Sequence, residues 1–387
     1  MATAQDACSF CSTFCKQGYI PSGVDGSDKR WQDDFLDDIG LSDITTGIWW
    51  TDDDPKTNSF LTAGEKIAAL SQEAANDLGL PTNVAVHSSF IDAYACWIST
   101  VGAKVQLGHN NSSESKPQDH VSQAFIRVAA VAGTSTCHPA MNEKSVFVNS
   151  VWGPYRDVLI SCYWMAEGGQ SATIELLKHV VGIDPAFQEA MSVAETFNMN
   201  IYDYLNEHLR EIDLFGNRSP IAEPEMKGSI IGVSSDTSMD SLAIAYHGTF
   251  EFIALQTDQI VESTNASGHV ISSIFMSGSQ CQNEVVMNLI AKACNIPVVI
   301  PRYVHAAVVH GAAISGAKAA STDKRGKSEP LWEIMNRLSK PGLTVYPNSD
   351  EGESQLLRAK YKVFLEQIQQ QKKYRKQLDN VVANWRR

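Results

Sequence analysis

The sequence lacks the features that mark several large classes of protein. No stretch is apolar over the roughly 20 residues that a membrane-spanning helix needs. It has no long basic run, and its formal net charge is −13, which argues against nucleic acid or an anionic membrane as the main partner. The first residues are polar and contain no apolar core of a secretory signal. We therefore expect a cytoplasmic protein.

The eight cysteines form no recognisable metal-binding framework. Cys8, Cys11 and Cys15 lie close together, but no fourth ligand follows at the spacing of a zinc site. We therefore predict reduced thiols, as is usual for cytosolic proteins, and no metal site built from these residues.

What is present is a long, globular chain. It has 387 residues, of which 43% are hydrophobic and 19% are charged. This length exceeds that of one ordinary core and predicts two lobes. The polar stretch 107–120 is the best candidate for a linker between them. Strand and helix patterns alternate, which favours an α/β fold.

Several elements can be predicted from hydrophobic spacing and from the residues that end each pattern. We predict helices over 63–80, over 306–320 and in an amphipathic segment near the C-terminus. We predict strands over 83–90 and 269–276, and a short edge strand between Pro297 and Pro301.

The stretch 125–141 is organised around a turn of small residues. An apolar run stops at Gly133, and Thr134, Ser135 and Thr136 follow before a second short run. Glycine lets the backbone approach a ligand, and the turn offers N–H groups and hydroxyls that suit a phosphate. An ordinary hairpin turn explains the same residues, and the local sequence leaves both interpretations open.

Polar residues that could line a site occur at three other points of the chain. Asp92 follows an apolar strand and precedes a helix, so it is either an N-cap or a carboxylate aimed into a cleft. Gly278 and its neighbours form a second turn before a helix, and Glu167 precedes two glycines. Nothing local explains Lys16, for which a solvated side chain is the simplest interpretation.

Nine short motifs, in order along nearly the whole chain, resemble those of the FGGY carbohydrate kinases and of their ribulokinase-like branch. The motifs are Cys11–Lys16, Gly79–Pro81 with Ile91–Ala95, Gly133–Thr136, Trp152–Tyr155, Glu167–Ala172, Gly216–Pro220, Phe275–Ser279 with Asn283, His310–Ala313 and Lys360–Phe364.

The resemblance implies an actin-like ATPase fold of two ribonuclease-H-like lobes. Residues 1–115 would be the C-terminal part of the sugar-binding lobe, and 116–387 would be the ATP-binding lobe. The family opens with an Asp-x-Gly-Thr hairpin, and no such segment precedes Lys16. We therefore expect an incomplete first lobe and a complete second lobe.

The resemblance also implies an activity, the ATP-dependent phosphorylation of a hydroxyl of a ketopentose such as D-ribulose, with Mg²⁺ bound beside ATP. Asp92 would be the general base. The sugar would contact Lys16, Asp92 and Glu167. The ATP phosphates would contact Gly133, Thr134, Ser135 and Thr136, and the adenosine would lie near Gly278, Ser279 and Asn283.

The sequence departs from the family pattern at Cys96, Ser99, Ile174 and Ser279, which stand where glycine is usual. A second hypothesis is therefore a catalytically inactive relative with a binding or regulatory role. An incomplete first lobe would expose a sheet edge, so self-association into a homo-oligomer is a further expectation.

Overall fold

The fold was analysed in a computed structural model that describes residues 8–12, 33–42, 60–105, 120–208, 235–347 and 350–385. Its first part holds two small sheets, a parallel pair of β1 with β2 and an antiparallel pair of β3 with β4. The elements of this part are β1 (Cys8–Ser9), α1 (Phe10–Ser12), α2 (Asp33–Asp38), β2 (Phe60–Leu61), β3 (Lys66–Ala69), α4 (Gln72–Leu78), β4 (Ala85–His87) and α5 (Asp92–Thr100).

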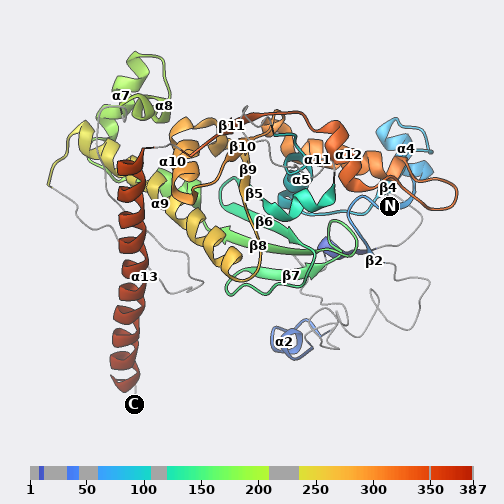
Figure 1. The fold of residues 1–387 in the computed structure, drawn as a ribbon, viewed down its shortest axis with the longest axis horizontal. Helices are drawn as coiled ribbons and strands as arrows, with labels where there is room; N and C mark the ends of the chain where they lie inside the picture. Colours follow the sequence, from blue (N-terminus) through green and yellow to red (C-terminus); the bar gives the residue numbers. More distant parts are fainter. Residues whose placement is uncertain are drawn as a thin grey trace.

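A seven-stranded sheet forms the centre of the molecule, in the order β11-β10-β9-β5-β6-β8-β7 (Figure 1). Strands β5, β9 and β10 run parallel to one another, and the other neighbours pair antiparallel. The strands are β5 (Arg127–Ala132), β6 (Thr136–Asn142), β7 (Trp152–Arg156), β8 (Trp164–Gln170), β9 (Ser273–Gly278), β10 (Val298–Ile300) and β11 (Leu343–Val345). The mixed sheet with helices on both faces confirms the predicted α/β class.

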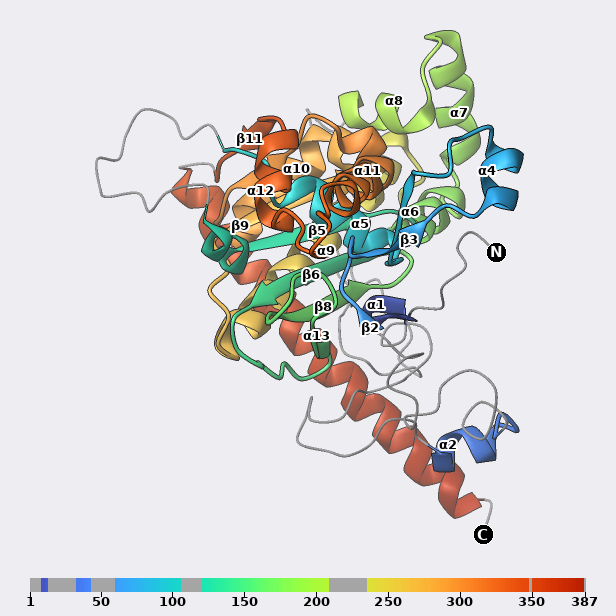
Figure 2. The ribbon, with the colours of Figure 1, turned by 90° about the vertical axis from the view of Figure 1, so that its right-hand side faces the viewer.

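Alternation along the strands divides the apolar side chains between two cores. In β9, Ile274 and Met276 belong to one core, and Phe275 between them belongs to the other. This period of two is what a strand buried on both faces requires. We call the sides of the sheet the α5 face and the α9 face, after the helices that cover them (Figure 2).

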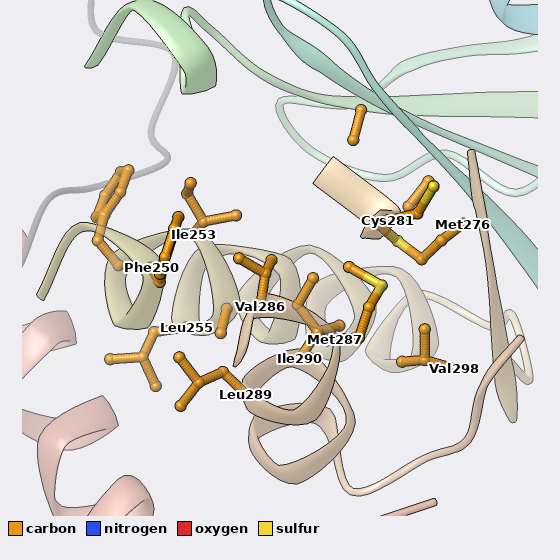
Figure 3. Close-up of a cluster of buried hydrophobic side chains, with 14 of the residues drawn as sticks. Phe250, Ile253, Leu255, Met276, Cys281, Val286, Met287, Leu289, Ile290 and Val298 are labelled. Carbon is orange, nitrogen blue, oxygen red and sulfur yellow. The ribbon is translucent and has the colours of Figure 1, made fainter. Parts of the chain in front are cut away.

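The α5 face is covered by three helices, α5, α11 (Ala307–Ala320) and α12 (Leu331–Leu338). The α9 face is covered by α9 (Met239–Ala266) and α10 (Glu284–Cys294), with α6 (Thr173–Gly182), α7 (Phe187–Thr196), α8 (Ile201–His208) and α13 (Glu351–Trp385) outside them. Figure 3 shows the α10 side chains Met287 and Ile290 near Met276 and Val298 of the sheet, with Phe250, Ile253 and Leu255 of α9 further along the same cluster.

The predicted helix over 63–80 is wrong in its first half. Lys66–Ala69 is a strand, and the helix covers only Gln72–Leu78. The helix begins after Ser71, whose hydroxyl accepts a hydrogen bond from the N–H of Ala74 (3.2 Å), as an N-cap does. The run of small apolar residues before Ser71 suits a strand as well as a helix, and pairing with β4 decides the outcome.

Other predictions need smaller corrections. The strand between Pro297 and Pro301 exists as β10, but β11 pairs outside it, so β10 is not an edge strand. The strand predicted over 83–90 is shorter, because β4 covers only Ala85–His87. The helices predicted over 306–320 and near the C-terminus are confirmed as α11 and α13. Within the described ranges, no helix combines the length and the apolar character needed to cross a membrane.

Candidate active site

The candidate base Asp92 is the exposed end of a buried helix. Residues 93–100 of α5 are all buried, whereas Asp92 is exposed at the first position of the helix. The N-cap position belongs to Ile91, so Asp92 is not the N-cap of its helix. Its Oδ1 accepts a hydrogen bond from the N–H of Ala93 (2.9 Å). The carboxylate is therefore accessible from outside the helix, as a general base must be to reach its substrate.

The turn after β5 has the short, open form that its sequence predicts. The N–H of Gly133 donates to the carbonyl of Ser135 (2.9 Å), which closes the turn on itself. Thr134 and Ser135 are exposed, so their hydroxyls are accessible to a ligand. Thr136 is different, because it is 3% exposed, begins β6 and has its hydroxyl 3.1 Å from that of Thr173.

The turn after β9 lies directly beside it. Ala132 at the end of β5 pairs with Gly278 at the end of β9, so the two turns leave the sheet at the same edge. Gly278 has a φ of +94°, and a Cβ there would lie 2.1 Å from the carbonyl oxygen of Ala132. Only glycine fits this close approach of two backbones. Ser279, the next residue, is exposed and begins a short 3₁₀ segment, η4 (Ser279–Gln282).

Asn283 has a structural role at the start of α10. Its side-chain oxygen accepts hydrogen bonds from the N–H groups of Val285 and Val286, as an N-cap residue does. Its side-chain nitrogen donates to Oδ1 of Asn206 (3.1 Å). The hydroxyl of Tyr246 donates to the same oxygen, and burial raises the pKa of that hydroxyl, which keeps it protonated as a donor.

The position of Asp92 relative to the turns follows from the direction of α5. Arg127, the first residue of β5, donates to the carbonyls of Val101 (2.6 Å) and Ala103 (3.3 Å), just beyond the last residue of α5. Side chains of α5 and β5 also share one core. The first residue of α5, Asp92, therefore lies toward the other end of β5, where the two turns leave the sheet.

Glu167 lies in the middle of β8 and is 7% exposed. It is two residues from Met165, which belongs to the core of the α5 face, so Glu167 is on that face too. In register it pairs with Pro139 of β6. The structure therefore places Glu167 on the same face of the sheet as Asp92, but in the middle of a strand and not at the end where the turns lie. Lys16 and the motif at 216–220 fall outside the described residues.

Two residues that the sequence did not single out connect the turns. The side-chain nitrogen of Gln280 donates to the hydroxyl of Thr173 (3.0 Å), which also lies against Thr136. Thr173 begins α6 and is 1% exposed. No spacing rule points to these contacts, because 107 and 37 residues separate the partners.

A magnesium ion would find few protein ligands near these turns. No group of three or more His, Cys, Asp or Glu side chains in the described ranges could hold a metal ion. Mg²⁺ usually keeps several waters and binds substrate phosphates plus one or two carboxylates. An ion held mainly by the ATP phosphates and by water would therefore need few protein ligands here.

The chain is similar to known carbohydrate kinases. Residues 128–320 match the C-terminal domain of the FGGY family of carbohydrate kinases. The chain is 45% identical over 345 residues to a D-ribulokinase of Saccharomyces cerevisiae, covering 83% of this chain and 48% of that protein. It is 32% identical over 397 residues to an FGGY carbohydrate kinase domain-containing protein of Danio rerio, covering 96% of this chain and 67% of that protein.

Solved structures of sugar kinases share the fold. Xylulose kinase from Rhodospirillum rubrum superimposes with a TM-score of 0.63 at 17% identity, covering 96% of this chain and 66% of that one. Glycerol kinase from Plasmodium falciparum with ADP gives a TM-score of 0.59 at 11% identity, covering 94% and 63%. The predicted actin-like ATPase fold is thereby confirmed. The chain spans about half to two thirds of the length of the curated relatives it matches.

Proposed function

Because this chain belongs to the FGGY family of carbohydrate kinases, we propose that it carries out the ATP-dependent phosphorylation of a ketopentose hydroxyl. The observation that carries the proposal is that Asp92 and the turns at 133–136 and 278–279 lie toward the same end of strands β5 and β9. The name of the similar yeast protein, a D-ribulokinase, favours D-ribulose as the sugar.

The residues divide the chemistry between them. Asp92 accepts the proton of the attacking sugar hydroxyl as the phosphoryl group is transferred. The N–H groups of the first turn, with the exposed hydroxyls of Thr134 and Ser135, bind phosphate oxygens. The second turn, at Gly278 and Ser279, supports the nucleotide. When bound with ATP, Mg²⁺ neutralises phosphate charge.

Further residues have supporting roles in this proposal. Glu167 and Lys16 bind the sugar. Thr136 and Asn283 hold the turns in place and do not contact the nucleotide, because Thr136 is buried and Asn283 caps α10. Residues 1–115 belong to the sugar-binding lobe and 116–387 to the ATP-binding lobe. A cytoplasmic location fits the thiols of Cys96, Cys162, Cys281 and Cys294, which form no disulfide within the described residues.

A second candidate is a binding or regulatory relative without turnover. It is favoured by departures from the family pattern, since Cys96, Ser99, Ile174 and Ser279 stand where glycine is usual. Phosphoryl transfer depends on positioning and on neutralising charge, so a site without all its phosphate contacts would lose many orders of magnitude in rate. Such a protein would still bind MgATP at the two turns, and self-association remains part of both candidates.

The test is ATP-dependent phosphorylation of D-ribulose by the purified 387-residue chain. Asp92→Asn should lower kcat by about 100-fold to 10,000-fold, the usual contribution of a general base, and leave MgATP affinity unchanged. Asp77→Asn, at an exposed carboxylate of α4, is the matched control and should change neither quantity. Retained MgATP binding without turnover of any ketopentose would favour the second candidate.

A further inference from the structure

The two turns of the candidate site are joined at their base by backbone and further out by side chains. At the base, Ala132 and Gly278 are neighbours in the sheet. Beyond that pair the strands end, since β5 continues into a hairpin and β9 into a helix. Beyond the sheet, the distance between the two turns therefore depends on side chains and backbone groups that contact both of them.

The bridge is the first residue of α6. The hydroxyl of Thr173 accepts a hydrogen bond from the Gln280 side chain (3.0 Å) and lies 3.1 Å from the hydroxyl of Thr136. In addition, the N–H of Ile174 donates to the carbonyl of Thr134 (3.3 Å). One residue and its neighbour therefore contact both turns.

We propose that Thr173 is a positioning residue that holds the two turns at a fixed separation, so that both can contact one nucleotide. This proposal rests on the function proposed above. Thr173 is too deeply buried to touch a ligand itself, with 1% of its surface exposed. It acts through Thr136, which anchors the first turn, and through Gln280, which anchors the second.

The hydroxyl is suited to this role by its bonding capacity. A hydroxyl has one proton to donate and two lone pairs to accept with, so Thr173 can accept from Gln280 and still donate to Thr136. The Oε1 atom of Gln280 is buried and has no partner within the described part of the chain. The bond to Thr173 is therefore what orients this amide.

The start of α6 is held in the same way. Ala172, the residue before Thr173, has a φ of +57° and offers no side-chain cap to the helix. A left-handed conformation is unfavourable for alanine and persists when its surroundings fix it. The contacts of Thr173 and Ile174 with the turns supply that constraint, so the helix start and the turns position one another.

The test uses Thr173→Val, which keeps the shape and removes the hydroxyl, and Thr173→Ser, which keeps the hydroxyl. Hydrogen exchange of the ligand-free protein should become about tenfold faster in 133–137 and 278–283 in the valine variant, the effect of one hydrogen bond lost at each turn. MgATP affinity, measured by calorimetry, should fall by about tenfold for the same reason. The serine variant should stay near the wild type in both.

Thr264→Val is the matched control. Thr264 is also a buried threonine, but within the described residues its hydroxyl bonds to its own helix alone, at the carbonyl of Ile260 (2.6 Å). This variant should lower the melting temperature without changing exchange in the turns or MgATP affinity. Should Thr173→Val fail to fold, Gln280→Leu breaks the same link from the other side and should speed exchange in 278–283.

The proposal is overturned if exchange in both turns of Thr173→Val matches the wild type, or if the serine variant behaves like the valine variant. If Thr173→Val folds, an additional effect of Gln280→Leu in that background on exchange in 278–283 would also contradict it, since both changes remove one bond. A wild type that binds no MgATP, while exchange still responds as expected, would count against the proposed function and support the positioning role.

Discussion

The two faces of the seven-stranded sheet are covered in different ways. On the α5 face, backbones touch: a Cβ on Gly311 of α11 would lie 1.9 Å from the carbonyl oxygen of Ala95 in α5. Large apolar side chains fill both cores. On the α9 face the close approach is to a side chain, because a Cβ on Gly168 of β8 would lie 2.7 Å from the side chain of Ile260 in α9. The ionisable side chains of Glu251 and His138 are also buried on this side. The face that carries Asp92 thus has a close contact between two helix backbones, whereas the close contact on the opposite face involves a side chain that can move.

This difference predicts how strongly a substitution on each face affects stability. Backbone contact leaves no room for an added atom, so it sets the position of α5 within narrow limits. Side-chain packing is adjustable, because neighbouring side chains can move when one is replaced. We therefore expect abrupt losses on the α5 face and graded ones on the α9 face.

The largest effect is expected for Gly311→Ala. The added methyl group would force α5 and α11 apart, and we expect a loss on the order of 4 kcal/mol or more, above the usual range for overpacking because backbone must move. Urea unfolding measures this loss. Because α5 carries Asp92, we expect kinase turnover to fall further than the folded fraction does.

Gly316→Ala on the same helix is the control. A Cβ there meets nothing within 4 Å. Alanine inside a helix is favoured over glycine by about 0.5–1 kcal/mol, so this variant should be slightly more stable than the wild type. Equal effects at the two positions would show that helix propensity, and not contact between backbones, decides the outcome.

A smaller loss is expected for Lys360→Met on the α9 face. Lys360 of α13 donates to Glu251 of α9 (2.6 Å), and both side chains are largely buried. Burial raises the pKa of Glu251, and Lys360 offsets part of that rise. Without the lysine, a buried carboxylate stays uncompensated or takes up a proton, and we expect thermal or urea unfolding to reveal a loss of about 3 kcal/mol.

The double variant Lys360→Met with Glu251→Gln tests the cause. A neutral amide needs no counter-charge, so this change should recover most of the lost stability. If stability stayed low, the methylene packing of Lys360 would be responsible, and the ion pair would have little weight in holding α13 on α9.

Much of the fold could be predicted from the sequence where local rules agree with tertiary contacts. The strand, turn and strand around Gly133 follow from apolar runs broken by small residues. The turn at Gly278 follows in the same way, and the structure adds that the two turns are neighbours. The helix predicted over 63–80 failed because its small apolar residues carry no single period, so pairing of β3 with β4 decided the structure.

The candidate site could be predicted only in part. Asp92 could be identified because a carboxylate between an apolar strand and an apolar helix is unusual. Thr173 and Gln280 could not, since their hydrogen bonds join residues far apart in the chain and depend on the sheet order. The burial of Thr136 could not be predicted either. The sequence next to a turn does not distinguish a buried hydroxyl that holds the turn in place from an exposed hydroxyl that contacts a ligand.

The smallest expected effect is on the pH dependence of folding stability, and it arises from a buried histidine on the α9 face. His138 of β6 is buried, and neither ring nitrogen has a partner within the described part of the chain. A Cβ on Gly168 would meet both Ile260 of α9 and the Cβ of His138, which places His138 on that face. Burial lowers the pKa of His138 to about 4.

The sign of the pH effect follows from this depression. As pH falls below about 6.5, the unfolded chain protonates this histidine while the folded protein does not until about pH 4, so folding loses stability across that window. Between pH 7.5 and pH 5.0 the loss is about 2 kcal/mol from this group. His138→Met, of similar volume, should remove that part of the pH dependence in urea unfolding. The exposed His179→Met should leave it in place, and identical pH profiles for the wild type and His138→Met would contradict the assignment.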